Sequence, residues 1–231
     1  MMPRPLLSVA LLGLLSAVTG VHLWAQWVAQ GRVADGTQWL LMPLLAGALW
    51  LDTRSGRSRL ARLTLLALVF SWLGDALPGF FSGDADFLVM VGCFLLAQLT
   101  YVNAFLPYAD RSVLHVGRIA LAPYVVFVVV LVTLCAAGAG VLLIPVLIYG
   151  GCLGAMAVLA TGVNGLVWVG GTTFLVSDAM IALDAFSDLE IPHSDFWVML
   201  TYVVAQVLIV LGVEEKAEQL TDPSPAPTDP S

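Results

Sequence analysis

Long apolar segments follow one another along nearly the whole chain, with short polar connections between them. Of the 231 residues, 60% are hydrophobic and 11% are charged, which is about half the charged share of a typical soluble domain. Water is absent from the bilayer core, so a segment that crosses it must satisfy its own backbone hydrogen bonds, as a helix does. The chain is therefore predicted to be an all-α, polytopic membrane bundle.

Eight of these segments are predicted membrane spans, and together they form a single bundle over residues 1–213. The spans are residues 5–24, 38–51, 60–80, 87–106, 119–137, 141–160, 164–183 and 196–213. The second span contains Pro43 and falls short of the ~20 residues needed to cross the hydrocarbon, so we expect it to be thin, tilted or partly re-entrant. Residues 214–231 include four prolines and are expected to form a disordered cytoplasmic tail.

The positive charges lie almost entirely on one side of the predicted bundle. Eight spans place both termini on the same side, and all but one of the nine Lys and Arg residues fall there. Because cytoplasmic loops carry an excess of Lys and Arg, both termini are predicted to be cytoplasmic. The residues on the terminal side are Arg4, Arg54, Arg57, Arg59, Arg62, Arg111, Arg118 and Lys216, whereas Arg32 falls on the other.

The charge content also bears on location and partners. The scarcity of lysine and of charged residues in general favours a bacterial inner membrane. The net charge is −7, and no basic patch indicates a nucleic-acid partner. The lipid bilayer is thus the expected surrounding, and the oligomeric state is left open by the sequence.

Two of the apolar segments contain an aspartate. Asp75 ends the sequence FSWLGD at residues 70–75, and Asp178 lies within residues 170–183. A carboxylate at membrane depth costs a few kcal/mol, so such residues tend to face a protein interior or a wet cavity. Both segments run outward in the predicted orientation, and each aspartate lies about 7–9 Å below the outer end at 1.5 Å per residue. The two are therefore expected to share a depth, and to be either functional or structural hydrogen-bonding centres.

Other polar side chains in the spans have spacings that place them on common helix faces. One pair is four residues apart in residues 71–75, another in residues 202–206, and a third is three residues apart in residues 98–101. These faces can line one polar cavity, although glutamines also join helices and serines also bond to their own helix backbone. The predicted substrate-binding residues are Ser71, Gln98, Tyr101, Ser177, Tyr202 and Gln206.

The remaining chemistry-bearing residues favour no other kind of site. The three cysteines lie in apolar segments and the three histidines are far apart, so neither a disulfide framework nor a metal site is indicated. A Gly-x-Ser-x-Gly sequence is absent, which weakens an acyl-serine mechanism. Gly170-Gly171, and Gly150 with Gly154, indicate close helix packing, and the acids of residues 184–195 indicate a solvated loop.

Five segments in this order resemble the YhhN family of membrane proteins, whose characterised animal members are lysoplasmalogenases. The similar segments are LMPLLA at residues 41–46, FSWLGD at 70–75, GCFLLAQLTY at 92–101, GTTFLVSDAMIAL at 171–183 and TYVVAQVLI at 201–209. This chain departs from the family in two places. Gln98 replaces a His that is common there, and Gln38-Trp39 replaces a common Lys-Pro pair.

The resemblance implies a hydrolase that cleaves the vinyl ether of a lysophospholipid to a fatty aldehyde and a glycerophospho-alcohol. Such hydrolysis begins with protonation of carbon and passes through an oxocarbenium ion, so it needs an acid and an anion. Two carboxyl groups in different environments can divide these roles. We expect one of Asp75 and Asp178 to be the acid and the other the stabilising anion or base, with neither a metal nor a cofactor.

Two other functions remain open at this stage. A small-molecule or proton-coupled transporter would use the same acids, and transporters often contain internal repeats with interrupted helices. The Ser and Asp shared by residues 71–75 and 177–178 are a faint sign of such a repeat. An accessory membrane scaffold, in which both aspartates serve folding alone, is the third possibility.

Overall fold

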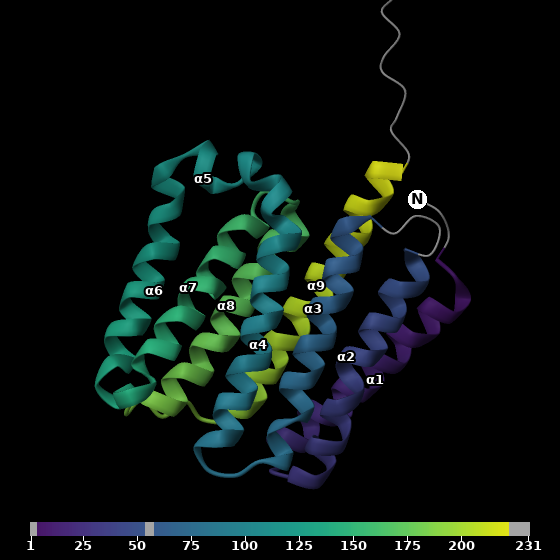
Figure 1. The fold of residues 1–231 in the computed structure, drawn as a ribbon. Helices are drawn as coiled ribbons and strands as arrows, with labels where there is room; N and C mark the ends of the chain where they lie inside the picture. Colours follow the sequence, from purple (N-terminus) through teal and green to yellow (C-terminus); the bar gives the residue numbers. More distant parts are fainter. Residues whose placement is uncertain (1–3, 54–57, 222–231) are drawn as a thin grey trace, which may run out of the picture.

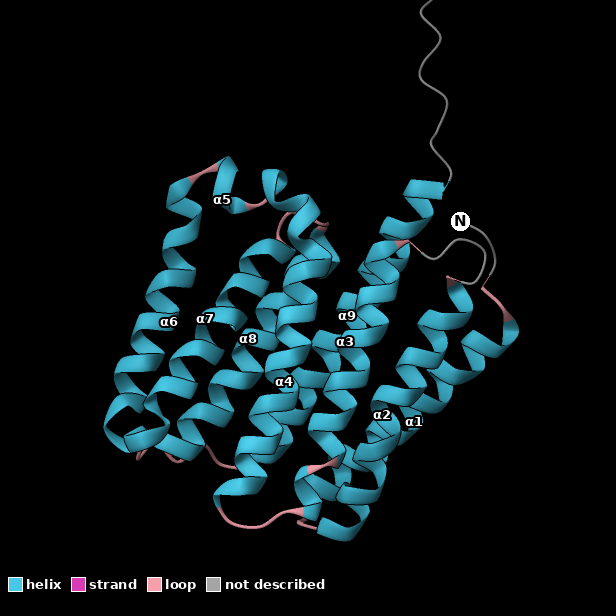
Figure 2. Ribbon diagram, viewed as in Figure 1, coloured by secondary structure: helices cyan, strands magenta, loops and turns pink. Residues whose placement is uncertain are grey.

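The computed structural model describes residues 4–53 and 58–221, which form helices joined by short connections (Figures 1 and 2). Arg54, Arg57 and residues 222–231, with the prolines of the predicted tail, lie outside this part of the chain. The α-helices are α1 Leu6–Trp27, α2 Gly31–Asp52, α3 Arg59–Ala76, α4 Asp84–Phe105, α5 Val113–Val116, α6 Arg118–Ala139, α7 Leu143–Ala160, α8 Gly165–Phe186 and α9 Ser194–Thr221. Short 3-10 helices occur at Pro78–Phe80, Leu106–Arg111 and Gly140–Leu142.

Several of these helices are long and apolar enough to cross a membrane, which confirms the predicted all-α membrane bundle. Six such stretches occur in the described residues, and one of them, Ile119–Ala160, covers both α6 and α7. The others are Leu6–Trp27, Arg59–Phe80, Asp84–Arg111, Gly165–Phe186 and Ser194–Leu220. The number of crossings and their orientation remain predictions from the sequence.

Helix α2 extends beyond the predicted second span, and it is not among the long apolar stretches found in the described residues. Helix α2 has 22 residues and continues through Pro43. Its first two turns carry Arg32, Asp35, Thr37 and Gln38, so the apolar pattern begins well after the helix does. Helix α2 packs against α1 and α3, and hydropathy does not detect its polar first turns.

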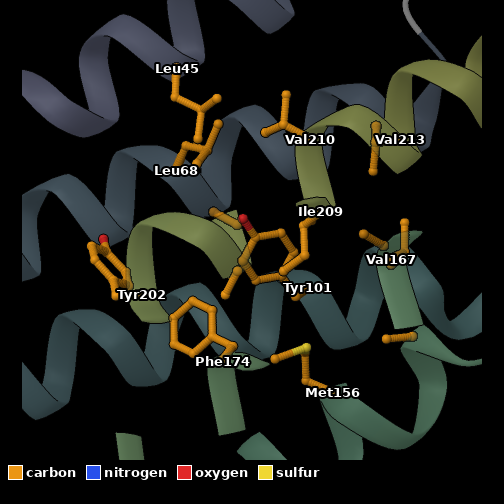
Figure 3. Packing of buried hydrophobic residues seen from close by; sticks show 14 of the residues in the cluster. Leu45, Leu68, Tyr101, Met156, Val167, Phe174, Tyr202, Ile209, Val210 and Val213 are labelled. Carbon is orange, nitrogen blue, oxygen red and sulfur yellow. The ribbon is translucent and has the colours of Figure 1, made fainter. Parts of the chain in front are cut away.

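The bundle has α4 at its middle, between α3 and α7, and α9 behind α3 (Figure 1). Helix α9 packs most extensively on α8 and also contacts α1, α2 and α3. Figure 3 shows the interior that results, in which Tyr101, Phe174 and Tyr202 lie among aliphatic side chains such as Ile209. Helix α9 therefore joins the α1–α3 side of the bundle to the α8 side.

Glycines bring α8 close to α9 and to α7. A Cβ added at Gly170 would lie 2.9 Å from the carbonyl oxygen of Ala205 in α9, and one at Gly171 would lie 2.8 Å from Cβ of Ala160 in α7. The close packing predicted for this glycine pair is thus confirmed. The same prediction is wrong for Gly150, where an added Cβ meets nothing within 4 Å among the described residues, whereas at Gly154 an added Cβ would lie 3.3 Å from Cγ2 of Val128 in α6.

The two ends of the described chain meet at one end of the bundle. The guanidinium of Arg4 donates to Oε2 of Glu214 at 2.8 Å, and Oγ of Ser8 donates to Oδ2 of Asp52 at 2.7 Å. The side chains of Asp52 and Glu214 are both only 8% exposed. The structure also differs from the expected domain boundary, because α9 continues past Val213 to Thr221 and residues 214–221 are helical.

The α8–α9 contact generates a test of the packing. We expect Gly170→Ala to lower the stability of the protein by about 1–3 kcal/mol, because the new methyl group would press on the backbone of α9. The matched control is Gly92→Ala within α4, where an added Cβ meets nothing within 4 Å, and this variant should be as stable as the parent or more so. Thermal unfolding in detergent measures both, and equal melting temperatures for the two variants would contradict the packing described.

Candidate active site

The carboxyl group of Asp75 is held by side chains from two other helices. Asp75 is the penultimate residue of α3. Its Oδ1 accepts a hydrogen bond from Nε2 of Gln38 in α2 at 3.2 Å, and its Oδ2 accepts one from the hydroxyl of Tyr202 in α9 at 2.9 Å. A carboxyl group away from bulk water requires such donors. Helices α2, α3 and α9 therefore converge on this residue.

Asp178 is held in a similar way on the other side of the bundle. It lies in α8 with only 7% of its surface exposed, and its Oδ2 accepts a hydrogen bond from the hydroxyl of Tyr149 in α7. The neighbouring Ser177 points to α9, where its Oγ donates to the carbonyl oxygen of Val198 at 2.9 Å. Adjacent residues of α8 thus bond to α7 and to α9.

The two aspartates line one cavity of about 340 Å³. This volume falls within the range of small-molecule sites. Polar side chains make up much of the wall, and no Lys or Arg is among the described residues that line it. These polar residues are Gln26, Gln38, Asp75, Ser177, Asp178, Asp184, Ser194, Asp195 and Tyr202.

The cavity lies near the end of the bundle opposite the chain termini. Ser194 and Asp195 begin α9, whereas Glu214, which pairs with Arg4, lies five turns later in the same helix. Asp184 is near the end of α8 and is exposed, as is Asp195. These acids form the rim of the cavity. The sequence analysis placed them in a solvated loop, but Asp184 lies within α8 and Asp195 within α9, and both line the cavity.

Three of the predicted substrate-binding residues form a fully buried chain of hydrogen bonds instead of cavity wall. The hydroxyl of Tyr101 donates to Oε1 of Gln206 at 2.6 Å, and Nε2 of Gln206 donates to Oγ of Ser71 at 3.0 Å. Because each is 0% exposed, the expectation that they line the cavity is wrong. The chain lies one helical turn from the bonded pair Asp75 and Tyr202, and it joins α3, α4 and α9 below the site.

Gln98 also departs from its predicted role. It is 0% exposed and lies near Tyr149, and its amide makes no hydrogen bond of normal geometry to another described residue. The cavity wall does not include it. Of the six residues predicted to bind substrate, only Ser177 and Tyr202 line the cavity.

Two residues that hold the aspartates were not among the predicted site residues. Tyr149 lies well inside an apolar segment, as Tyr101 and Tyr202 do, and this was the only signal for it. Gln38 was noted in the sequence only as a departure from the family pattern. It is the first residue of the predicted second span, and no spacing signal indicated its contact with Asp75.

Comparison with known proteins finds a family whose sequence model covers the two aspartates of this site. The sequence model of the YhhN family matches residues 33–213, a range that contains both aspartates and all their hydrogen-bonding partners. This chain belongs to the YhhN family. The expectation drawn from the five similar segments is confirmed.

Named relatives in this comparison are lysoplasmalogenases. The lysoplasmalogenase of Mycobacterium bovis is 32% identical over 193 residues, covering 75% of this chain and 67% of the relative. The human lysoplasmalogenase TMEM86B is 34% identical over 181 residues, covering 77% of this chain and 74% of the relative. No solved structure matches the chain.

The buried chain of hydrogen bonds can be tested through stability. We expect Gln206→Leu to leave the hydroxyl of Tyr101 without a partner and to destabilise the protein by about 1–3 kcal/mol. In a double-mutant cycle with Tyr101→Phe, the two changes should be non-additive by about 1 kcal/mol. Unfolding in detergent mixed with dodecyl sulfate measures each variant. The control is Gln219→Leu at an exposed position, and additive effects of the first two changes would contradict the bond.

Proposed function

We propose that this protein is a membrane lysoplasmalogenase, which hydrolyses the vinyl ether of a lysoplasmalogen to a fatty aldehyde and a glycerophospho-alcohol. Membership of the YhhN family and the named relatives support the reaction class. The observation that carries the proposal is the cavity into which α3 and α8 each present one aspartate.

Asp75 and Asp178 are the proposed catalytic residues. Hydrolysis of a vinyl ether needs a proton donor for carbon and an anion for the oxocarbenium ion that follows, and two carboxyl groups supply both. A low-dielectric site strengthens the interaction between the anion and the developing positive charge. Tyr202, Gln38 and Tyr149 fix the two carboxyl groups through the hydrogen bonds described above, so that little reorganisation accompanies the reaction.

The substrate is a lysophospholipid taken from the surrounding bilayer. The described residues that line the cavity carry carboxyl, amide and hydroxyl groups, and none of them is Lys or Arg. This favours a head group that carries an amine, whose ammonium group can face Asp184 and Asp195 at the rim. Lysoplasmenylethanolamine is accordingly the substrate of choice for assay.

We place the protein in a bacterial inner membrane with both termini in the cytoplasm, following the distribution of Lys and Arg. The ion pair between Arg4 and Glu214 supports termini on one side. In this orientation the cavity opens toward the outer leaflet, because its rim lies at the other end of the bundle from that pair.

The roles of the aspartates are tested by replacing each with an uncharged amide of the same shape. With lysoplasmenylethanolamine as substrate, Asp75→Asn and Asp178→Asn should each lower kcat for aldehyde release by about 10²–10⁴-fold. Asp110→Asn is the control, since this carboxylate is 95% exposed and should not affect the rate.

Melting temperatures and binding of the non-cleavable alkyl-ether lysolipid show whether each variant is folded. Loss of aldehyde release in folded variants that still bind this analogue supports the proposal. An active Asp75→Asn or Asp178→Asn enzyme would overturn the catalytic assignment. A parent protein that binds the lysolipid and releases no aldehyde would overturn the proposed reaction.

A further inference from the structure

A second, apolar crevice lies beside the polar cavity, between α4, α7 and α8. It has a volume of about 50 Å³. Val91 of α4, Val146 of α7, and Ala182 and Phe186 of α8 line it, together with the ring of Tyr149. The rings of Phe87 and Phe186 meet edge to face at its border, with centroids 5.3 Å apart. The crevice therefore offers hydrocarbon contacts where the first cavity offers polar ones.

Asp178 lies where the crevice and the cavity join. Five residues line both, and of these Asp178 is polar while Phe87, Met90, Phe94 and Ile181 are apolar. Asp75 lines the polar cavity but is not part of the crevice. The two aspartates thus differ in surroundings, one at the border with hydrocarbon and the other among amide and hydroxyl groups.

A lysoplasmalogen has the same division along its length. Its vinyl ether has the glycerophospho head group on the oxygen side and the hydrocarbon chain on the carbon side. On the basis of the proposed function, we propose that the head group occupies the polar cavity while the alkenyl chain passes Asp178 into the crevice between α4, α7 and α8. The crevice holds only the first few carbons of the chain, and the remainder extends between these helices into the bilayer.

This placement assigns a separate role to each aspartate. The carbon that receives the proton, C2′, is on the chain side of the double bond, and the carbon that receives water, C1′, bears the ether oxygen. Asp178 therefore donates its proton to C2′, and the electron pair of the double bond forms the new C–H bond. C1′ becomes the oxocarbenium centre, next to the Asp178 carboxylate.

The remaining steps return both groups to their starting states. Water adds to C1′ and gives its proton to the carboxylate of Asp75, which forms the hemiacetal. Asp75 then donates that proton to the glyceryl oxygen as the C1′–O bond breaks, and the hemiacetal hydroxyl gives its proton to Asp178. The products are the fatty aldehyde and the glycerophospho-alcohol, and one water is consumed.

The path of the chain is tested first by photolabelling, which does not depend on turnover. The probe is an alkyl-ether lysophosphatidylethanolamine with a diazirine on the third carbon of its chain, incubated with the full-length protein in liposomes. Labels on residues 87–94, on 146–149 or on 181–186 support the proposal. Labels confined to α1, α2 or α9, or no label competed by unlabelled lysolipid, would overturn it whether or not the protein releases aldehyde.

A filled crevice should discriminate between substrates by chain length. Val146→Phe should raise KM for a hexadecenyl substrate by about tenfold or more, a typical effect of obstructing an apolar pocket. The same variant should barely change KM for a butenyl substrate, whose chain ends near the border. Val129→Phe is the control because this residue lies on α6 and is 57% exposed. Equal changes in KM for both chain lengths in Val146→Phe would overturn the assignment.

The separate roles of the aspartates are tested by exchange in deuterium oxide. In folded Asp75→Asn the addition of water is slowed, so protonation by Asp178 becomes reversible. After rotation about the C1′–C2′ single bond of the cation, return of the original hydrogen to Asp178 should give recovered substrate with deuterium at C2′ and inverted double-bond geometry. Folded Asp178→Asn should show no exchange. Exchange in Asp178→Asn alone, or in neither variant, would overturn the assignment, and the rate of aldehyde release by the parent protein tests the overall reaction separately.

Discussion

A carboxyl group inside an apolar bundle must receive hydrogen bonds from its surroundings, and this constraint shapes the whole structure. Each of the two aspartates obtains donors from other helices: Asp75 from α2 and α9, and Asp178 from α7. The cost of leaving such a group without donors is several kcal/mol in an apolar medium. The bonds that create the site therefore also determine which helices lie beside one another.

Helix α9 supplies hydrogen-bond donors to α3. Tyr202 and Gln206 lie one turn apart on the same face, and they bond to Asp75 and Ser71, which are one turn apart on α3. Gly170 of α8 allows α9 to approach closely enough for Ser177 to reach Val198. A site built from side chains on packed helices holds its geometry better than one built on loops. Here α9 is positioned both by its close packing on Gly170 and by its hydrogen bonds to α3.

The sequence was sufficient to identify the apolar segments, because hydropathy alone predicts them, and to single out both aspartates, because a charge in such a segment is rare. It was not sufficient for the full length of α2, whose first turns are polar. The presence of a serine, glutamine or tyrosine within a span does not show whether its side chain lines a cavity or packs between helices. Ser71, Tyr101 and Gln206 have the same spacing signals as Tyr202, and only the positions of α3, α4 and α9 in space separate them.

The acids at the rim illustrate a related limit. Asp184 and Asp195 were expected to be solvated, which is correct, but they lie within α8 and α9 and not in the loop between these helices. Their proximity to the cavity follows from the packing of α8 against α9, a property of the tertiary structure. Tyr149 was not predicted as a site residue because an aromatic residue in an apolar helix is ordinarily part of the core.

The bond between Tyr202 and Asp75 has a consequence for biosynthesis. These residues are 127 positions apart, and at ordinary rates of translation the later one leaves the ribosome roughly 6–25 s after the earlier. During that interval α3 is already in the membrane without its partner from α9. Until α9 arrives, Gln38 of α2 can already donate to Oδ1 of Asp75, whereas Oδ2 needs another donor, such as water, in the nascent bundle.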